Sequence, residues 1–409
     1  MATITFETLT FSDSGNNVRV NLLGLCSTLI PKEQFEQIAP FSITRNSITF
    51  DGISEEQANK SFLNLFSQYT KHLKNNITKN KTTYIHRNSG IPLIGNVAFG
   101  IVYRNSNVIE IKPNNGCNLD CVYCSISEGI SSKKNDFIVE KDYLVEELHK
   151  LIQFVDQPVE VHIGVQGEPF LYGDMMNLIE DIQQMENVHT ISIDTNGSLL
   201  NKQKIDRLAA CDKLQFNLSL DSINPETAKK VAGVNSYNVN HVKDVIAYAA
   251  ERLNVIVAPV LTKGFNEEEM EPIIKFIKSL PKQPMLGIQN FLRYKTGRNV
   301  AKEIPWKEFY ELLEKLEQKH DIKLKLSKED FNIKKTKKLE KPFKTDDIVR
   351  ATVMSDGRFL NSKLAVAKDR TISIPLCTAS IGKKVNVKIT KDKHNTYTGQ
   401  LVSNTTRAI

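Results

Sequence analysis

Three cysteines, Cys117, Cys121 and Cys124, share one short loop and constrain this chain more than any other feature. The β-branched run 108–112 precedes them and stops at the turn-forming segment 113–116 (PNNG), so it predicts a strand that ends where the cysteines begin. Thiolates at spacings of four and three residues can converge from one loop on a soft metal centre. A cubane iron–sulfur cluster takes four ligands, so a loop with three leaves one iron open.

A zinc knuckle is the alternative for such a loop, and it requires a fourth Cys or His nearby to complete a tetrahedron. The next histidines along the chain, His149 and His162, lie in a helical pattern and a strand pattern respectively. Neither is an obvious fourth ligand. The spacing therefore favours a cluster with an open iron.

The pattern CxxxCxxC, with Tyr123 directly before the last cysteine, resembles the signature of the radical S-adenosylmethionine (SAM) superfamily. The resemblance implies that Cys117, Cys121 and Cys124 hold a 4Fe–4S cluster whose open iron binds SAM, with Tyr123 in the SAM site. It also implies that the reduced cluster cleaves SAM to a 5′-deoxyadenosyl radical. An external donor such as ferredoxin or flavodoxin is then expected to deliver the electron.

Short apolar runs alternate with helical patterns from residue 108 to about 290, which predicts a parallel α/β sheet. The expected strands are 108–112, 159–165, 190–194, 214–220, 254–260 and 285–290. The expected helices are 140–155, 173–185, 201–210, 225–250 with a break near Gly233, and 267–280. Six such units match the partial (βα)6 barrel of the superfamily, so the resemblance implies that barrel. Periodicity alone does not separate it from an open sheet.

Polar residues follow the expected strands, whose carboxyl ends meet at one edge of a parallel sheet. The segment 164–169 (GVQGEP) resembles the glycine-glycine-glutamate element of the superfamily, with Gln166 in place of a glycine. The resemblance implies that Gly167 and Glu168 contact the SAM ammonium, because a carboxylate beside an ammonium forms a charge-assisted hydrogen bond.

The next two strands supply further SAM candidates by the same resemblance, namely Thr195, Asn196, Ser219 and Asp221. Asp221 has an alternative role, since it could cap the helix that begins near Pro225. After the sixth strand, Gln289, Arg293 and Arg298 are expected on the substrate side. An arginine at a loop edge is, however, more often simply solvated.

The sequence predicts four regions: a small α+β region at 1–95, the radical SAM barrel at 100–320, a lysine-rich linker at 321–344 and a β-barrel at 345–409. Five short strands are expected in the last region, at 349–353, 364–367, 371–374, 385–389 and 397–402. Their number and length predict an OB-like barrel, a fold that often binds oligonucleotides.

Residues 374–387 resemble part of a TRAM domain, an RNA-binding barrel attached to several tRNA-modifying enzymes. The resemblance implies that basic side chains there follow RNA phosphates, and the candidates are Arg358, Arg370, Lys383, Lys384 and Lys388. The alternative is a barrel that only packs against the enzyme or against another protein.

Charge supports a nucleic-acid partner, since the chain has a net charge of +7 that is concentrated at its end. Residues 321–409 hold 20 Lys and Arg against 9 Asp and Glu. The other three cysteines, Cys26, Cys211 and Cys377, are scattered and do not form a disulfide pattern, so a cytoplasmic, reducing location is expected. No apolar run is long enough for a membrane span. Nothing in the sequence indicates an oligomeric state.

Two functions are compatible with these features, and a third conflicts with part of them. The first is a radical SAM enzyme that modifies a nucleotide in tRNA or other structured RNA. The second is a radical SAM enzyme acting on a small metabolite or peptide, with the C-terminal barrel as a docking module. Peptide-modifying relatives commonly carry extra C-terminal cysteines, and here Cys377 alone lies in that region. The third, a non-enzymatic iron–sulfur protein that binds RNA, conflicts with the SAM motifs.

Overall fold

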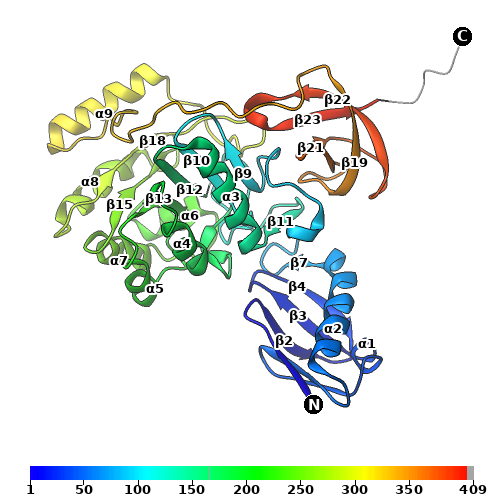
Figure 1. The fold of residues 1–409 in the computed structure, drawn as a ribbon. Helices are drawn as coiled ribbons and strands as arrows, with labels where there is room; N and C mark the ends of the chain where they lie inside the picture. Colours follow the sequence, from blue (N-terminus) through cyan, green and yellow to red (C-terminus); the bar gives the residue numbers. More distant parts are fainter. Residues whose placement is uncertain (165, 403–409) are drawn as a thin grey trace, which may run out of the picture.

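The computed structural model describes residues 1–164 and 166–402. A sheet with its helices lies on the left in Figure 1, with the N-terminal region at the lower right and the C-terminal barrel at the upper right. In these described residues no helix is long and apolar enough to cross a membrane.

The central sheet has seven strands in the order β17-β15-β14-β13-β12-β10-β9. Six of them run parallel and follow one another in chain order, while β9 pairs antiparallel at the edge. Their bounds are β9 Gly100–Tyr103, β10 Val108–Lys112, β12 Val159–Ile163, β13 Val188–Thr195, β14 Leu214–Leu218, β15 Asn254–Val257 and β17 Met285–Leu286. The predicted parallel α/β arrangement is confirmed.

The last two expected strands are each divided. Residues 254–260 form β15 and then β16 (Val260–Leu261), which pairs with β18 (Gln289–Asn290) in a separate sheet of two strands. Pro259 lies at the first division and has no amide hydrogen for a strand ladder. The second part of each expected strand therefore belongs to this small sheet and not to the seven-stranded sheet.

Helices connect these strands, at α3 Lys141–Val155, α4 Met175–Gln183, α5 Lys202–Leu208, α6 Pro225–Ala232, α7 Val239–Ala250 and α8 Met270–Ser279. The predicted break near Gly233 is confirmed, because Gly233 ends α6 in the left-handed conformation with a φ of 70°. A further helix, α9 (Trp306–His320), buries Phe309, Leu313 and Leu316.

The N-terminal region contains two antiparallel sheets and a long helix. The strands are β1 Ala2–Thr5, β2 Leu9–Ser14, β3 Asn17–Leu22, β4 Cys26–Pro31, β5 Phe41–Ile43, β6 Ser47–Phe50 and β7 Lys74–Asn75. Short α1 (Lys32–Glu36) follows β4, and α2 (Glu55–Tyr69) begins after Ser54, whose hydroxyl accepts a hydrogen bond from the Gln57 amide at 3.2 Å. Next, β8 (Thr82–Ile85) pairs in parallel with β11 (Asp136–Val139), a strand that follows the cysteine loop.

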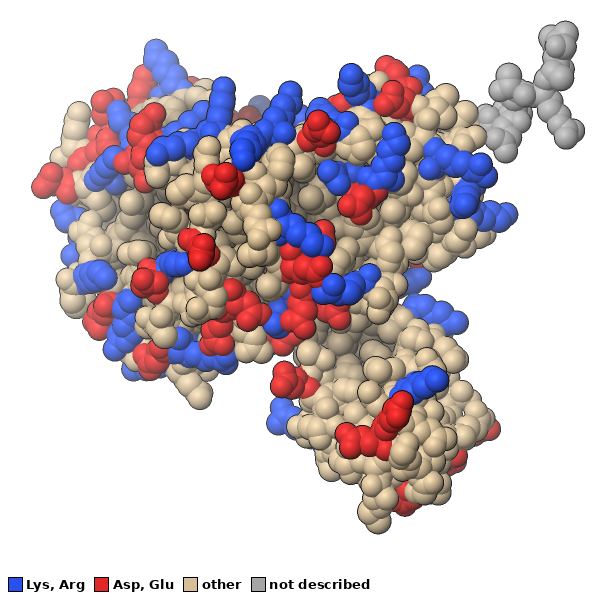
Figure 2. Space-filling model, viewed as in Figure 1, with Lys and Arg blue, Asp and Glu red and all other residues tan. Residues whose placement is uncertain are grey.

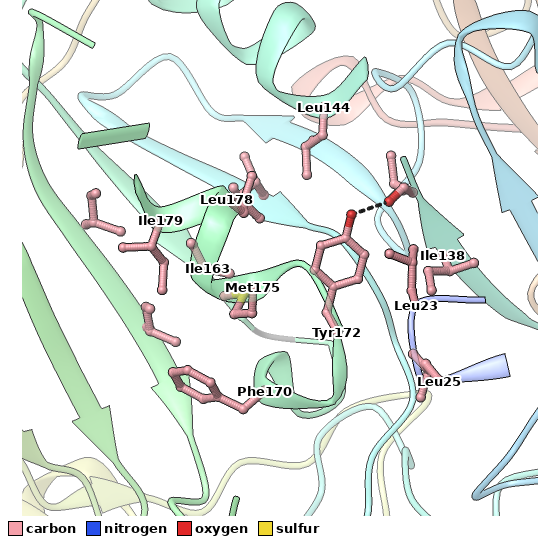
Figure 3. Close-up of a cluster of buried hydrophobic side chains, with 14 of the residues drawn as sticks. Leu23, Leu25, Ile138, Leu144, Ile163, Phe170, Tyr172, Met175, Leu178 and Ile179 are labelled. Carbon is pink, nitrogen blue, oxygen red and sulfur yellow. Dashed lines mark hydrogen bonds between the residues drawn. The ribbon is translucent and has the colours of Figure 1, made fainter. Parts of the chain in front are cut away.

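The N-terminal region shares its hydrophobic core with the central sheet. In Figure 3, Leu23 and Leu25 lie beside Tyr172, whose hydroxyl donates to the carbonyl of Val139 at 2.7 Å. Backbone contact is also close, because a Cβ on Gly173 would meet the Leu23 carbonyl oxygen at 2.4 Å. The N-terminal region therefore supports the turn that carries Glu168.

The C-terminal region is a closed barrel of five strands with its own buried core, as predicted. Its strands are β19 Ile348–Asp356, β20 Lys363–Ala367, β21 Arg370–Ile374, β22 Lys384–Lys391 and β23 Tyr397–Leu401. The order is β19-β20-β21-β23-β22, closed by pairing of β19 with β22, and β21 and β23 run parallel.

The lysine-rich segment 321–344 is bound along the central domain. The amide of Asn107 donates to the Lys334 carbonyl at 3.0 Å, and the amide of Thr336 donates to the Asn105 carbonyl at 3.1 Å. Leu324 and Phe343 are buried at its two ends. Its backbone is consequently fixed while most of its lysines remain exposed.

Candidate active site

A cavity of about 330 Å³ opens at the carboxyl ends of the parallel strands. Cys117, Cys121 and Cys124 line it. It is also lined by Gln289 and by every SAM candidate from the sequence, namely Tyr123, Gly167, Glu168, Thr195, Asn196, Ser219 and Asp221. The structure thus brings together eleven residues that lie far apart along the chain.

The end of α6 positions the cysteine loop. The amides of Asp120 and Val122 donate to the carbonyls of Ala232 and Val231, each at 2.9 Å. Carbonyls in the last turn of a helix have no partner within that helix, so the loop satisfies them. Gly233 makes this contact possible, because a Cβ there would meet the Asp120 carbonyl oxygen at 2.1 Å.

We expect Gly233→Ala to displace the cysteine loop and to lower the iron retained after anaerobic reconstitution several-fold. The substitution adds about 1–2 kcal/mol of strain at a left-handed residue and a backbone clash. Gly264→Ala is the matched control, since Gly264 also has a positive φ (81°) but nothing lies within 4 Å of its Cβ position. Equal iron loss in both variants would mean that backbone strain, and not contact with the loop, is responsible.

Arg298 binds the cysteine loop and lies outside the cavity lining, in contrast to its expected place on the substrate side. Its guanidinium donates to the carbonyls of Cys121 and Glu128, each at 3.1 Å, and to the carboxylate of Asp120. Its own amide donates to the Cys124 carbonyl at 2.9 Å. Arg293 is exposed and likewise lies outside the lining, so of the three substrate-side candidates Gln289 alone lines it.

Glu168 is 1% exposed and connects two strand ends. Its carboxylate accepts hydrogen bonds from the Thr195 hydroxyl at 2.7 Å and from the amides of Asn196 and Phe170 at 2.9 and 3.1 Å. Burial raises the pKa of Glu168, although these donors oppose the rise. Three of the SAM candidates therefore form one hydrogen-bonded unit.

Asp221 does not cap the following helix. That helix is capped by Asn224, whose side-chain oxygen accepts from the amides of Glu226 and Thr227. The Asp221 carboxylate instead accepts from the Tyr123 hydroxyl at 2.7 Å and from the Val260 amide at 2.8 Å. Burial raises the pKa of Asp221 to about 6.

The thiols suit a multinuclear cluster better than a single ion. Among residues 1–164 and 166–402, no three His, Cys, Asp or Glu side chains are placed to hold one metal ion. A zinc site needs four ligands around one ion, whereas the thiolates of a cubane bind separate irons. Burial raises the pKa of Cys121 to about 12, so it remains a thiol until a cation binds. Cys117, Cys121 and Cys124 line one cavity, and three cysteine ligands with one open iron fit a 4Fe–4S cluster.

Arg358 was expected on an RNA-binding surface, but the structure buries it against the cysteine loop region. It is 7% exposed, and its guanidinium pairs with Glu128 and, at 2.8 Å, with Asp136. Glu128 is itself 4% exposed, and its amide donates to the Cys124 sulfur at 3.2 Å. The other oxygen of Asp136 accepts from Asn75 at 2.9 Å in the N-terminal region. Arg358 is therefore unavailable to phosphate, because its charge is already paired.

The remaining basic candidates lie on the C-terminal barrel surface. Lys383 and Lys384 are exposed, and Lys388 is exposed but paired with Asp346 at 2.9 Å. Arg370 is half-buried and donates to the carbonyl of Asp369 at 2.8 Å.

The sequence reasoning missed Glu128, Asp194 and Asn290, all of which line the cavity. Glu128 stands in a loop without any motif, so nothing in the sequence singles it out. Asp194 could have been predicted, because it precedes Thr195 at a strand end and lies on the same face of β13 as Ser192.

His162 and Asp194 form a charged pair on the sheet. The imidazole contacts the Asp194 carboxylate at 3.0 Å and the Ser192 hydroxyl at 2.7 Å. Burial alone lowers the pKa of His162, but the carboxylates of Asp194 and Glu160 outweigh it and raise the pKa to about 10. The folded protein therefore holds this histidine protonated.

We expect the NMR signal of His162, assigned by comparison with His162→Gln, not to titrate across physiological pH. Because the pKa rises on folding from 6.5 to about 10, the stabilisation from this charge is complete below pH 6.5 and is lost as the pH rises through about 10. A titration midpoint near the ordinary value would contradict the charged pair.

Comparison with known proteins agrees with this geometry. The family model described as Radical SAM superfamily matches residues 111–277. An uncharacterized protein of Methanocaldococcus jannaschii is 35% identical over 378 residues, which cover 85% of this chain and 87% of that protein. A GTP 3′,8-cyclase of Limosilactobacillus fermentum is 31% identical over 182 residues, or 43% of this chain. The chain spans about half of that enzyme, 52% of its length.

Two solved structures complete the comparison. SuiB of Streptococcus suis bound to S-adenosylmethionine has a TM-score of 0.42 and 15% identity, and the match covers 79% of this chain and 72% of the SuiB chain. TYW1 with a lysine-pyruvate adduct has a TM-score of 0.40 and 19% identity, and the match covers 58% of this chain and 80% of the TYW1 chain. The family match shows that residues 111–277 form a domain of the radical SAM superfamily of enzymes, whose cofactors are a 4Fe–4S cluster and SAM.

Proposed function

We propose that this enzyme modifies a nucleotide in structured RNA such as tRNA. The observation that carries the proposal is the five-stranded barrel with exposed lysines that is joined to the cysteine loop through buried Arg358. Small barrels of the OB type commonly bind oligonucleotides. In this proposal the barrel is TRAM-like and the six parallel strands are the partial (βα)6 barrel of the superfamily.

The residues of the cavity receive the following roles. Cys117, Cys121 and Cys124 hold the cluster, and Glu168, oriented by Thr195 and Asn196, accepts hydrogen bonds from the SAM ammonium. Ser219 and Asp221 bind the SAM ribose and carboxylate side, with Tyr123 and Gly167 completing the pocket, and Gln289 faces the substrate. When bound and reduced by an external donor, the cofactors supply a 5′-deoxyadenosyl radical that removes a hydrogen atom from the substrate.

Charge supports RNA over a free nucleoside triphosphate. The relatives named GTP 3′,8-cyclase act, by that name, on GTP. Among the described residues that line this cavity, Glu128, Glu168, Asp194 and Asp221 are acidic and none is Lys or Arg. A triphosphate has no counter-charge there, whereas the phosphates of an RNA can stay outside.

Basic side chains are available outside the cavity. Figure 2 shows Lys and Arg along the upper edge of the molecule, where Figure 1 places α9, the linker and the C-terminal barrel. The linker contributes the exposed lysines Lys334, Lys335, Lys337 and Lys338. Such a surface supports salt-dependent contact with a polyanion.

The proposal is tested by mass spectrometry of tRNA nucleosides from cells with and without the gene. We expect one modified nucleoside to disappear in the deletion strain and to return when the wild-type gene, but not Cys121→Ala, is supplied. Unchanged RNA nucleosides would favour the second candidate, an enzyme for a small metabolite or peptide with the C-terminal barrel as a docking module.

A separate prediction concerns the contribution of Lys383 and Lys384 to RNA binding. We expect Lys383→Ala with Lys384→Ala to weaken tRNA binding. The slope of log K against log salt concentration should also become shallower by about two, one for each phosphate that the protein no longer neutralises. Filter binding across a salt series measures both quantities. Lys60→Ala, at an exposed lysine on α2, is the control and leaves the slope unchanged. An unaltered slope in the double variant would remove these lysines from the RNA interface.

A further inference from the structure

A second cavity of about 410 Å³ adjoins the first. The two share Asp194, Gln289, Asn290 and Leu292 as lining residues. The second cavity, here called the α9 chamber, lies between the strand ends and α9, which contributes Trp306, Phe309 and Tyr310. Anything bound in the α9 chamber therefore lies next to the cluster cavity.

The lining of the α9 chamber is almost free of charged side chains. Of its described lining residues Asp194 alone carries a charge, and no Lys or Arg is among them. The Asp194 side chain is 42% exposed, while His162 at 3.0 Å and Asn217 at 2.9 Å hold its two oxygens in place. A carboxylate fixed in this way accepts hydrogen bonds from N–H donors, and because protonated His162 is already paired with Asp194, the described lining residues offer phosphate no free counter-charge.

A second acceptor stands at the boundary between the two cavities. The Asn290 side chain is 8% exposed, and its oxygen is buried without a protein partner. The orientation of this amide is set, because its nitrogen donates to the Ile304 carbonyl at 2.7 Å. A buried acceptor without a partner is costly, so the site favours a ligand that brings an N–H group.

Aromatic rings form the wall on the side of α9. Trp306 and Tyr310 are 51% and 45% exposed, and their rings stack with centroids 5.7 Å apart. Exposed aromatic faces bind flat rings by stacking, and such stacking tolerates any base. The α9 chamber thus offers a stacking wall opposite two hydrogen-bond acceptors.

We propose that the α9 chamber binds the uncharged base of the target nucleotide, with Asp194 and the Asn290 oxygen accepting hydrogen bonds from its N–H groups and with every phosphate left outside. This inference rests on the proposed function and specifies which part of the RNA enters. A base in a helix has to leave its stack to reach the chamber. Because the described residues of both linings include no Lys or Arg, the phosphates have no counter-charge there and stay outside in this proposal.

The test uses Trp306, which is the one tryptophan in the chain. The reconstituted holoenzyme, with SAM saturating its own site, is titrated with guanosine, cytidine and uridine and then with their 5′-triphosphates at equal ionic strength. Fluorescence of Trp306 reports binding, and equilibrium dialysis with labelled nucleosides checks it independently. We expect saturable quenching by at least one nucleoside and at least tenfold weaker binding of its triphosphate.

Three variants make the test specific to the chamber. Tyr310→Ala and Asp194→Asn are each expected to weaken nucleoside binding about tenfold, and Asp194→Asn also reduces the discrimination against triphosphate. Lys307→Ala, on the same helix with a side chain 89% exposed, is the control and leaves both unchanged. Circular dichroism verifies that each variant is folded.

The inference is overturned if no nucleoside binds, or if a triphosphate binds as tightly as its nucleoside. These outcomes are distinct from failure of the proposed function. If the deletion strain loses an RNA modification but no nucleoside binds, base binding in the α9 chamber is refuted while RNA remains the proposed substrate. Nucleoside binding with unchanged RNA would instead identify an enzyme that acts on free nucleosides.

Discussion

Replacing Arg358 with alanine is expected to lower the free energy of unfolding by about 3–5 kcal/mol and to reduce cluster retention. Arg358 pairs with two carboxylates, Glu128 and Asp136, which are 4% and 2% exposed. Without the guanidinium, both acids remain buried, Glu128 with Lys134 at 3.8 Å and Asp136 with the uncharged donor Asn75. Urea denaturation measures the stability, and iron content after anaerobic reconstitution measures the effect on the site.

Lys388→Ala is the matched control for Arg358→Ala, since it removes an ion pair from the same barrel. The partners in that pair are 50% and 75% exposed, so its loss is expected to change stability by less than about 1 kcal/mol. A stability loss in Arg358→Ala that is no larger than in Lys388→Ala would show that the barrel does not hold the cysteine loop in place.

The second large effect is expected from Cys121→Ala, which should abolish both cluster absorbance and SAM cleavage. A loop with two remaining thiols cannot supply the three protein ligands that leave a single iron open for SAM. Formation of 5′-deoxyadenosine after reduction with dithionite measures cleavage.

Cys211→Ala is the control for Cys121→Ala, because Cys211 is 3% exposed and lies outside the cavity lining. It is expected to retain the cluster and full cleavage. Wild-type iron content and cleavage in Cys121→Ala would mean that the cluster is held elsewhere.

Local patterns explain what could be predicted from the sequence. The strand before the cysteines, the parallel sheet and the five-stranded barrel all follow from alternation and turn residues over a few positions. The meeting of Glu168 with Thr195 and Asn196 also follows, because residues at the carboxyl ends of parallel strands share one edge. The division of the strand at Pro259 could have been read from the missing amide hydrogen of proline.

The roles of the arginines could not be predicted in the same way. Arg298 and Arg358 stand in loops where a solvated side chain is the usual expectation. Their partners lie 178 and 230 residues away along the chain, so no local spacing connects them. Only the fold shows that Arg298 binds the cysteine loop and that Arg358 pairs with the acids beside it.

Asp136 accepts from Asn75 of the N-terminal region on one oxygen and from Arg358 of the C-terminal barrel on the other. Arg358 lies 222 residues after Asp136, so a ribosome that adds roughly 5–20 residues per second makes it roughly 10–45 seconds later. Until then Glu128 and Asp136 have no arginine partner. We therefore expect iron delivery to follow synthesis of the C-terminal barrel, so that a product truncated before Arg358 is purified colourless.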